Sequence, residues 1–298
     1  MKSRCKGNER CSTWVRCGVH VSIAGSIDRA VDRAKEKGCE TFQIFTRNPR
    51  SWSFRKLFSL EVKRFKDKIR TSSIEPVVAH MPYLPNLSCP KESVYKRSVS
   101  ALITELKRCS MLEIPYLVTH LGSHLGKGRK VGLEHLIGAI NASLDSSKDN
   151  TMLLLENSAG GKNAIGSSLT EVREILDNID EKGRAAVCFD TCHAFAAGYD
   201  LRTDKAVERV VEEIEEVIGW ALLKVIHMND SKGVLGSSVD RHEHIGMGHI
   251  GEDGFRAILR HKFFRELPMI LETPIDERGD DIVNLEKIRR ISMETKIC

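Results

Sequence analysis

The residues with the clearest chemical potential lie in the stretch 187–200. An apolar run at residues 185–189, typical of a buried strand, ends at Asp190, and His193 follows three residues later. A carboxylate and an imidazole at this spacing just past a strand can point into one cleft and bind metal, although not necessarily the same ion. Taken alone, the pair is explained equally well by an Asp that caps a turn and a hydrogen-bonded surface His.

Similar ionisable side chains follow the other apolar runs along the chain. Six successive predicted strands end in His80, His120, Glu156, Asp190, His227 and Glu272. Neighbouring members are separated by 34 to 45 residues, which is the step from one barrel strand to the next, so each returns to the same rim. Carboxylates gathered there without a cation would repel one another and lose solvation, so the pattern predicts bound metal.

Two further candidates lie in the loop after the seventh strand. Asp240 and His242 alternate along the chain, so an extended loop would aim both side chains to one side. With His193 they bring the candidate ligands to nine, which exceeds the needs of one tetrahedral ion and suits two or three. Mixed imidazole and carboxylate ligands favour zinc or manganese over calcium or magnesium. We expect Cys188 to point into the core and Cys192 not to be a ligand.

The elements that would position these residues alternate between strand and helix. We predict strands at 15–21, 41–45, 77–79, 116–119, 152–155, 185–189, 225–227 and 269–271. We predict helices ending near residue 37 and spanning about 60–69, 92–109, 133–144, 169–179, 203–218, 254–259 and 281–291. Eight short apolar strands with eight helices favour a (β/α)8 TIM barrel of parallel strands, with its active site at the C-terminal rim. A doubly wound open sheet is the competitor, but no G-x-G-x-x-G follows the first strand.

Composition and length are those of an ordinary globular protein. The chain has 298 residues, 41% hydrophobic and 29% charged, and no apolar run approaches the roughly 18 residues of a membrane span. We expect residues 1–14 to be a basic, poorly ordered tail and 15–298 to be a single barrel domain. Because the nine cysteines form no C-x-x-C pair and no secretory signal is evident, we expect free thiols and a cytoplasmic location. The net charge of +5 permits a polyanionic partner without requiring one.

Several motifs resemble the endonuclease IV family of apurinic/apyrimidinic (AP) endonucleases, from about Gly18 to the last strand. The resemblance is carried by His80, His120, and the stretches 18–25, 45–52, 154–157, 189–200, 227–230, 239–242 and 271–273. One departure is Leu121, where bacterial members have proline, and we expect it to adjust the loop rather than remove a ligand.

This resemblance implies a trinuclear zinc site in a TIM barrel. It assigns one ion to His80, His120 and Glu156, and a second to Glu156, Asp190, His227 and Glu272. It assigns the third to His193, Asp240 and His242. The implied substrate is duplex DNA with an abasic site, cut 5′ to the lesion to leave a 3′-hydroxyl, or DNA with a blocked 3′ end. Glu156 is the expected catalytic residue, as a ligand and as a possible proton acceptor, and we expect a monomer.

DNA contacts must come from the loops at the rim. The resemblance makes Arg50, Tyr83 and Leu84 the residues that wedge into the base stack where the abasic nucleotide flips out. Further basic and aromatic candidates, which a solvated basic face would explain as well, are Arg47, Trp52, Arg55, Lys56, Lys127, Arg129 and Lys130.

Two other functions fit parts of the pattern. A divalent-metal sugar isomerase or epimerase also uses strand-end His, Asp and Glu, but needs neither a third group of ligands nor a basic wedge loop. A non-catalytic, zinc-stabilised nucleic-acid-binding module would bind damaged duplex without cleaving it. Metal content separates the first alternative from a nuclease, and a nicking assay separates the second.

Overall fold

A computed structural model describes residues 15–148 and 150–295 of the chain. The predicted basic tail at residues 1–14 lies outside the described residues, and so do Cys5, Cys11 and Cys298. Among the described residues, no helix combines the length and the apolar character that crossing a membrane requires.

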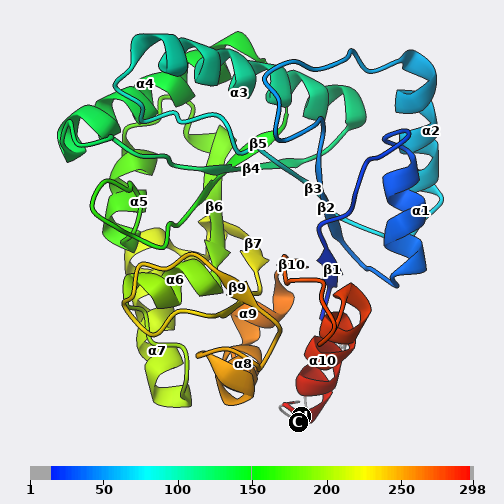
Figure 1. Cartoon of the computed structure of the whole chain (residues 1–298), viewed down its shortest axis with the longest axis vertical. Helices are drawn as coiled ribbons and strands as arrows, with labels where there is room; N and C mark the ends of the chain where they lie inside the picture. Colours follow the sequence, from blue (N-terminus) through cyan, green and yellow to red (C-terminus); the bar gives the residue numbers. More distant parts are fainter. Residues whose placement is uncertain (1–14, 149, 296–298) are drawn as a thin grey trace, which may run out of the picture.

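Eight parallel strands form the barrel that the sequence predicts (Figure 1). They are β1 (Cys17–Val19), β2 (Phe42–Phe45), β3 (Val77–His80), β4 (Tyr116–His120), β5 (Met152–Glu156), β6 (Ala185–Asp190), β7 (Leu223–His227) and β10 (Met269–Leu271). Chain neighbours pair from β2 through β7, and β10 lies between β7 and β1.

The seam between β1 and β2 closes the ring through few contacts. A parallel bridge joins His20 to Gln43, and the amide of Val21 donates to the carbonyl of Gln43 at 2.8 Å. A Cβ on Gly18 would lie 1.6 Å from the carbonyl oxygen of Thr41, so only glycine permits this approach of the two strands.

Helices surround the barrel between successive strands (Figure 1). They are α1 (Arg29–Glu36), α2 (Ser59–Arg70), α3 (Glu92–Leu112), α4 (Arg129–Ser146), α5 (Leu169–Asp177), α6 (Thr191–Ala197), α7 (Asp204–Glu213), α8 (Gly251–Arg260), α9 (Lys262–Glu266) and α10 (Asp281–Glu294). Single turns at Lys182–Arg184, Ile214–Ile218 and Trp220–Leu222 lead into β6 and β7.

The predicted elements are present, and the structure adds three that were missed. The helix expected at 203–218 is α7 followed by one π-helical turn, which Gly219 ends at a φ of 81°. The additions are α6, α9 and a small hairpin of β8 (Asp230–Ser231) and β9 (His242–Glu243). The two helices have seven and five residues and the strands of the hairpin two each, which is too short for a periodic apolar pattern to reveal.

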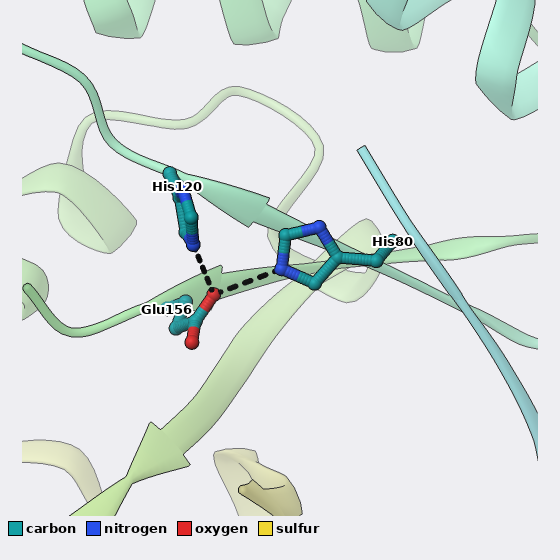
Figure 2. Close-up of side chains that lie close together, drawn as sticks. All are labelled: His80, His120 and Glu156. Atoms are coloured by element: carbon teal, nitrogen blue, oxygen red, sulfur yellow. Dashed lines mark hydrogen bonds and ion pairs between the residues drawn. The ribbon is translucent and has the colours of Figure 1, made fainter. Parts of the chain in front are cut away.

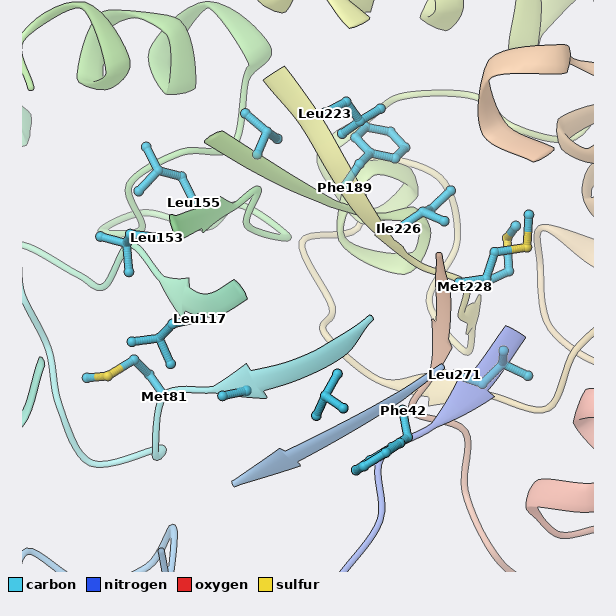
Figure 3. Packing of buried hydrophobic residues seen from close by; sticks show 14 of the residues in the cluster. Phe42, Met81, Leu117, Leu153, Leu155, Phe189, Leu223, Ile226, Met228 and Leu271 are labelled. Atoms are coloured by element: carbon cyan, nitrogen blue, oxygen red, sulfur yellow. The ribbon is translucent and has the colours of Figure 1, made fainter. Parts of the chain in front are cut away.

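Alternation along each strand divides the apolar side chains into two layers. One set packs between the strands and the helices; Figure 3 shows Leu153 and Leu155 of β5 in it with Leu117 and Phe189. The other set fills the barrel interior and consists of Val78, Val118, Leu154, Ala186, Cys188, Val225 and Ile270. Cys188 therefore points into the core as predicted, and no disulfide joins the cysteines of the described residues.

Candidate metal centre

Successive side chains along a strand point alternately outward and inward, and this places the predicted ligands inside the C-terminal rim of the barrel. Each lies two residues beyond a side chain of the interior layer, so it faces the barrel axis one level higher. The pairs are Val78 and His80, Val118 and His120, Leu154 and Glu156, Cys188 and Asp190, Val225 and His227, and Ile270 and Glu272. At this level the barrel opens into a cavity of about 390 Å³ that His80, His120, His193, Asp240 and Glu272 help to line.

The first cluster joins β3, β4 and β5 (Figure 2). The Nε2 atoms of His80 and His120 each lie 3.1 Å from Oε2 of Glu156. The Nδ1 atom of His80 donates to the carbonyl of Met81 at 2.7 Å, which leaves Nε2 as the nitrogen directed at the cavity. This arrangement is the usual way in which a protein orients a histidine toward a metal ion.

The second cluster shares Glu156 and adds groups from β6, β7 and the end of β10. Nδ1 of His227 lies 3.0 Å from Oε1 of Glu156, 3.3 Å from Oε2 of Glu272 and 3.8 Å from Oδ2 of Asp190. The four residues offer ligand atoms within 4.8 Å of one another. Glu156, Asp190 and His227 are fully or almost fully buried.

The third set contains His193, Asp240 and His242. Oδ1 of Asp240 lies 3.2 Å from Nε2 of His193 and 3.6 Å from Nε2 of His242. Asp190 caps α6 by accepting from the amide of His193 at 2.7 Å, which turns the His193 side chain back over the cavity. The hairpin of β8 and β9 presents His242, whose Nδ1 donates to the carbonyl of Glu272 at 3.0 Å.

Cys192 is also close to the third set, because its sulfur lies within 4.8 Å of ligand atoms of Asp240 and His242. The thiol is directed at the carbonyl of Arg241, 3.7 Å away. Burial and the neighbouring Asp190 raise the pKa of this thiol, which disfavours the thiolate that binds metal. We keep the prediction that Cys192 is not a ligand.

Burial and opposite charges compete in setting the pKa values of the cluster. Burial by itself would raise the pKa of Glu156, but His227 and His120 hold it well below its usual range. Burial would lower the pKa of His193, but Asp190, Asp240 and Glu156 raise it to about 10. The charged form of Glu156 and the protonated form of His193 are thus both favoured by their neighbours, so this part of the site attracts positive charge.

Two asparagines orient the second cluster, and sequence reasoning missed both. The amide of Asp190 donates to Oδ1 of Asn157 at 2.7 Å, and Nδ2 of Asn229 donates to Oδ2 of Asp190 at 2.7 Å. Oδ1 of Asn229 also accepts from the amide of Glu272 at 2.8 Å. Their position at strand ends, directly after Glu156 and two residues after His227, was the available signal.

Two rim loops carry the predicted wedge residues. The amide of Tyr83 donates to the carbonyl of Pro49 at 3.3 Å, so the loop after β3 is joined to the loop that carries Arg50. The Tyr83 ring contacts Phe45 edge-on at 5.1 Å between centroids, yet the residue remains 61% exposed, and Leu84 is 38% exposed. Arg50 is exposed beside them.

Three other basic candidates have structural partners. Arg47, predicted as a possible DNA contact, is buried and forms an ion pair with Glu105, so that prediction is wrong. Arg55 pairs with Glu61 at 2.8 Å, and Arg129 pairs with Glu171 at 2.6 Å.

The substitution at Leu121 is absorbed within its loop. Leu121 is fully buried, and the Ser88 hydroxyl donates to its carbonyl at 2.6 Å. A Cβ on Gly166 would lie 2.1 Å from Leu121 Cδ1, so a glycine provides the space for this side chain. His120, the preceding residue, stays within 3.1 Å of Glu156.

Known proteins with the same fold include distant ones and others that are more similar in sequence. A family model described as Xylose isomerase-like TIM barrel matches residues 31–294. The probable endonuclease 4 of Methanoculleus marisnigri is 55% identical over 279 residues, which are 93% of this chain and 99% of that protein. The crystal structure of endonuclease IV from Thermus thermophilus has a TM-score of 0.84 at 35% identity, covering 94% of this chain and 99% of the other. A D-tagatose 3-epimerase-like protein has a TM-score of 0.70 at 20% identity, covering 94% and 97%, and shares the fold alone.

Proposed function

Because this chain belongs to the endonuclease IV family of AP endonucleases, we propose that it is a zinc-dependent DNA-repair endonuclease. It hydrolyses the phosphodiester 5′ to an abasic site in duplex DNA, leaves a 3′-hydroxyl, and removes blocking groups from 3′ ends. We expect it to act inside the cell, where its substrate is.

The convergence of six strand ends, the first turn of α6 and one hairpin on a single site carries this proposal. The side chains gathered there are four carboxylates and five imidazoles: Glu156, Asp190, Asp240, Glu272, His80, His120, His193, His227 and His242. A structural role would explain one or two of them, but not nine in overlapping clusters at the functional rim of a barrel.

The donor set fits metal ions. His242 Nε2 is a buried atom without a hydrogen-bond partner in the described structure, and it faces Asp240 at 3.6 Å and Asp190 at 3.8 Å. An unpaired buried nitrogen directed at two carboxylates is costly unless a cation lies between them. Imidazole and carboxylate donors in these numbers suit zinc.

We assign three zinc ions to the clusters. His80, His120 and Glu156 would hold the first; Glu156, Asp190, His227 and Glu272 the second; and His193, Asp240 and His242 the third. Zinc bound there would neutralise the phosphate, lower the pKa of water from about 15.7 toward about 7, and stabilise the leaving 3′ oxygen.

Glu156 is the residue that we place nearest the reaction. Its two oxygens lie within 3.1 Å of imidazole nitrogens of His80 and His227, which places it at the centre of the ligand sets. We assign it the roles of shared ligand and of proton acceptor for the attacking water. The buried floor of the cavity excludes other solvent from this carboxylate, since Leu154 and Val225 fill the layer below.

Arg50, Tyr83 and Leu84 are the residues that we assign to DNA. Their two loops are hydrogen-bonded to each other, and Tyr83 lies at the edge of the same cavity as His80 and Glu272. A guanidinium beside an exposed aromatic ring and an exposed leucine suits a phosphate contact together with insertion into the base stack.

One assay tests the proposal. A 5′-labelled duplex with a single abasic-site analogue is incubated with the protein, with and without a chelator. We expect one nick immediately 5′ to the lesion, an end that a DNA polymerase can extend, and loss of nicking with chelator that added zinc reverses. An undamaged duplex is the matched control.

The two alternatives predict different results in the same assay. A nucleic-acid-binding module would retard the duplex without nicking it. A sugar epimerase would neither retard nor nick the duplex, and would interconvert ketoses with one or two ions bound. The epimerase-like protein that shares the fold is only 20% identical, so it gives this hypothesis no specific support.

A further inference from the structure

The strands β1 and β2 supply no predicted ligand, yet side chains from their seam contact the second cluster. Gln43, on β2, and His20, just after β1, are the two residues of the bridge that joins these strands. Gln43 is fully buried, and His20 lines the cavity with Glu272. The seam of the barrel is therefore also a wall of the candidate metal centre.

The Gln43 amide connects two of the candidate ligands directly. Its Oε1 lies 2.9 Å from Nε2 of His227, and its Nε2 lies 2.7 Å from Oε1 of Glu272. The same Nε2 lies 3.1 Å from Nδ1 of His20. Both ends of the amide are thus occupied by groups at the cavity.

The chemistry of these contacts determines which way each group faces. The NH2 end of Gln43 donates to Oε1 of Glu272, and a primary amide presents its two hydrogens only on that nitrogen. The carbonyl end then faces His227, and because a carbonyl accepts, His227 must carry hydrogen on Nε2. His227 is left with Nδ1 as its inward nitrogen, beside Oε1 of Glu156 and Oε2 of Glu272.

His227 differs in this respect from other histidines of the site. His80, His193 and His242 each donate Nδ1–H to a backbone carbonyl and direct Nε2 inward. At His227 the acceptor is the side-chain amide of Gln43 instead of a backbone carbonyl. Here Nε2 is the donor and Nδ1 faces inward. A substitution cannot remove a backbone carbonyl, but it can remove the Gln43 amide. The orientation of His227 can therefore be tested by mutating residue 43.

We propose that Gln43, supported by His20, is a positioning residue that sets the inward nitrogen of His227 and the free oxygen of Glu272 for the second metal ion. The inference rests on the proposed metal-dependent function. Gln43 itself contacts neither DNA nor the ion; it acts through His227 and Glu272.

Two variants of Gln43 and one control distinguish the role of its amide group from the effect of its side-chain volume. Gln43→Leu keeps a buried side chain of similar volume without polar ends. Gln43→Glu keeps the shape and an acceptor for His227 but loses the donor to Glu272. Ser143→Ala, which removes a buried hydroxyl of α4 that donates to the Ala139 carbonyl, controls for truncation of a buried polar group elsewhere.

The readout is metal retention rather than turnover. Zinc-loaded proteins are mixed with a chromophoric chelator, and the release of each ion is followed with time; visible spectra of the cobalt-substituted proteins report coordination. We expect Gln43→Leu to release one ion about 10- to 100-fold more readily than wild type, with an altered cobalt spectrum and the other ions retained. Gln43→Glu should release the same ion at least as readily as Gln43→Leu, because two carboxylates would face each other at Glu272.

Each result has a definite meaning. Ion release and cobalt spectra of Gln43→Leu that match wild type would overturn the proposal, and a Gln43→Glu variant that holds its metal normally would overturn the orientation argument. Equal loss of all ions, with a lowered melting temperature, would make Gln43 a structural residue of the seam and reject the positioning role. Failure of wild type itself to hold metal would instead reject the proposed function.

Discussion

At the scale of single residues, Glu156 is the shared member of the candidate metal centre. Oε2 lies 3.1 Å from both His80 and His120, and Oε1 lies 3.0 Å from His227 and 3.4 Å from His193. A buried carboxylate with this many cationic or ligating neighbours stays ionised, and its removal leaves several groups without their common partner.

We expect Glu156→Gln to lower the rate of abasic-site cleavage more than about a hundredfold, with DNA binding affected far less. The amide preserves the shape of the side chain but removes the charge and the proton acceptor. Single-turnover cleavage and an equilibrium binding assay on the same duplex measure the two effects. Glu134→Gln, at an exposed glutamate of α4, is the control, and near-normal turnover of Glu156→Gln would refute the catalytic role.

At the scale of elements, two joined loops above β2 and β3 carry the residues that we propose to contact DNA, apart from the candidate metal ligands. Phe45 anchors the Tyr83 ring, and the Pro49 carbonyl holds the Tyr83 amide, so the exposed tip of one loop is supported by the other. Arg50 is exposed on the loop after β2, and its permanently charged guanidinium has only donors, so it is not a metal ligand.

Arg50→Ala should therefore weaken binding to an abasic duplex and reduce its salt dependence by about one phosphate contact, while zinc content stays unchanged. A 3′-phosphate at a frayed end, which needs no wedge, should lose less activity. Binding is measured as a function of salt concentration, with Lys262→Ala on α9 as a control of equal charge change. Loss of zinc, or equal impairment on both substrates, would place Arg50 in the structural or catalytic core.

A group of ion pairs around Glu252 joins α8 to α10. Glu252 of α8 lies 3.0 Å from Arg256 in its own helix, 3.3 Å from Lys287 and 3.0 Å from Arg290 of α10. Hydrogen bonds and charge from Arg290, and to a lesser extent from Lys287, lower the pKa of Glu252 to about 2. A carboxylate whose pKa is lower in the folded state stabilises the fold above its unfolded pKa and loses this effect as pH falls through the folded value.

We expect Glu252→Gln to reduce the free energy of unfolding by about 1 kcal/mol at neutral pH and low salt, and by less at high salt, because the pairs are partly exposed. The difference from wild type should be constant above the ordinary carboxyl pKa of 4.5 and shrink as pH falls from there toward about 2. Denaturant unfolding of chelator-treated proteins measures it. Glu266→Gln is the control, since that carboxylate lies 3.9 Å from Lys262 on the surface, and a pH-independent difference would contradict the ionic origin.

At the scale of the whole molecule, the barrel stacks an apolar layer beneath a highly charged one. Interior side chains such as Leu154 and Ile270 exclude water from below, and the ligand candidates occupy the level above. Buried like charges at that level oppose folding unless cations balance them, so metal binding and stability should be coupled.

We expect about three zinc ions per chain by elemental analysis, one for each proposed ligand set. Chelation should lower the melting temperature by several degrees, because an ion that binds only the folded chain stabilises it, and added zinc should restore it. Calorimetry with and without chelator measures the shift. One ion or fewer in fully active protein would refute the trinuclear site.

Much of this molecule could be predicted from the sequence because barrel geometry is periodic. Apolar runs recurring at intervals identify the strands, and the residue that ends each run must lie on one rim. Asp240 and His242 alternate as an extended segment should, and the structure places both beside His193. The wedge residues and the division of ligands among ions came from family resemblance rather than from periodicity.

Only the tertiary structure decided which charges are available and which nitrogens face inward. Arg47 and Arg50 look alike in sequence, but Arg47 is buried against Glu105, a residue 58 positions away that no local pattern connects to it. Gln43 and His227 are 184 positions apart, and their contact exists because the barrel closes between β1 and β2. Hydrogen bonds of this kind depend on distances between side chains from distant segments, and those distances are set only when the whole ring of strands has closed.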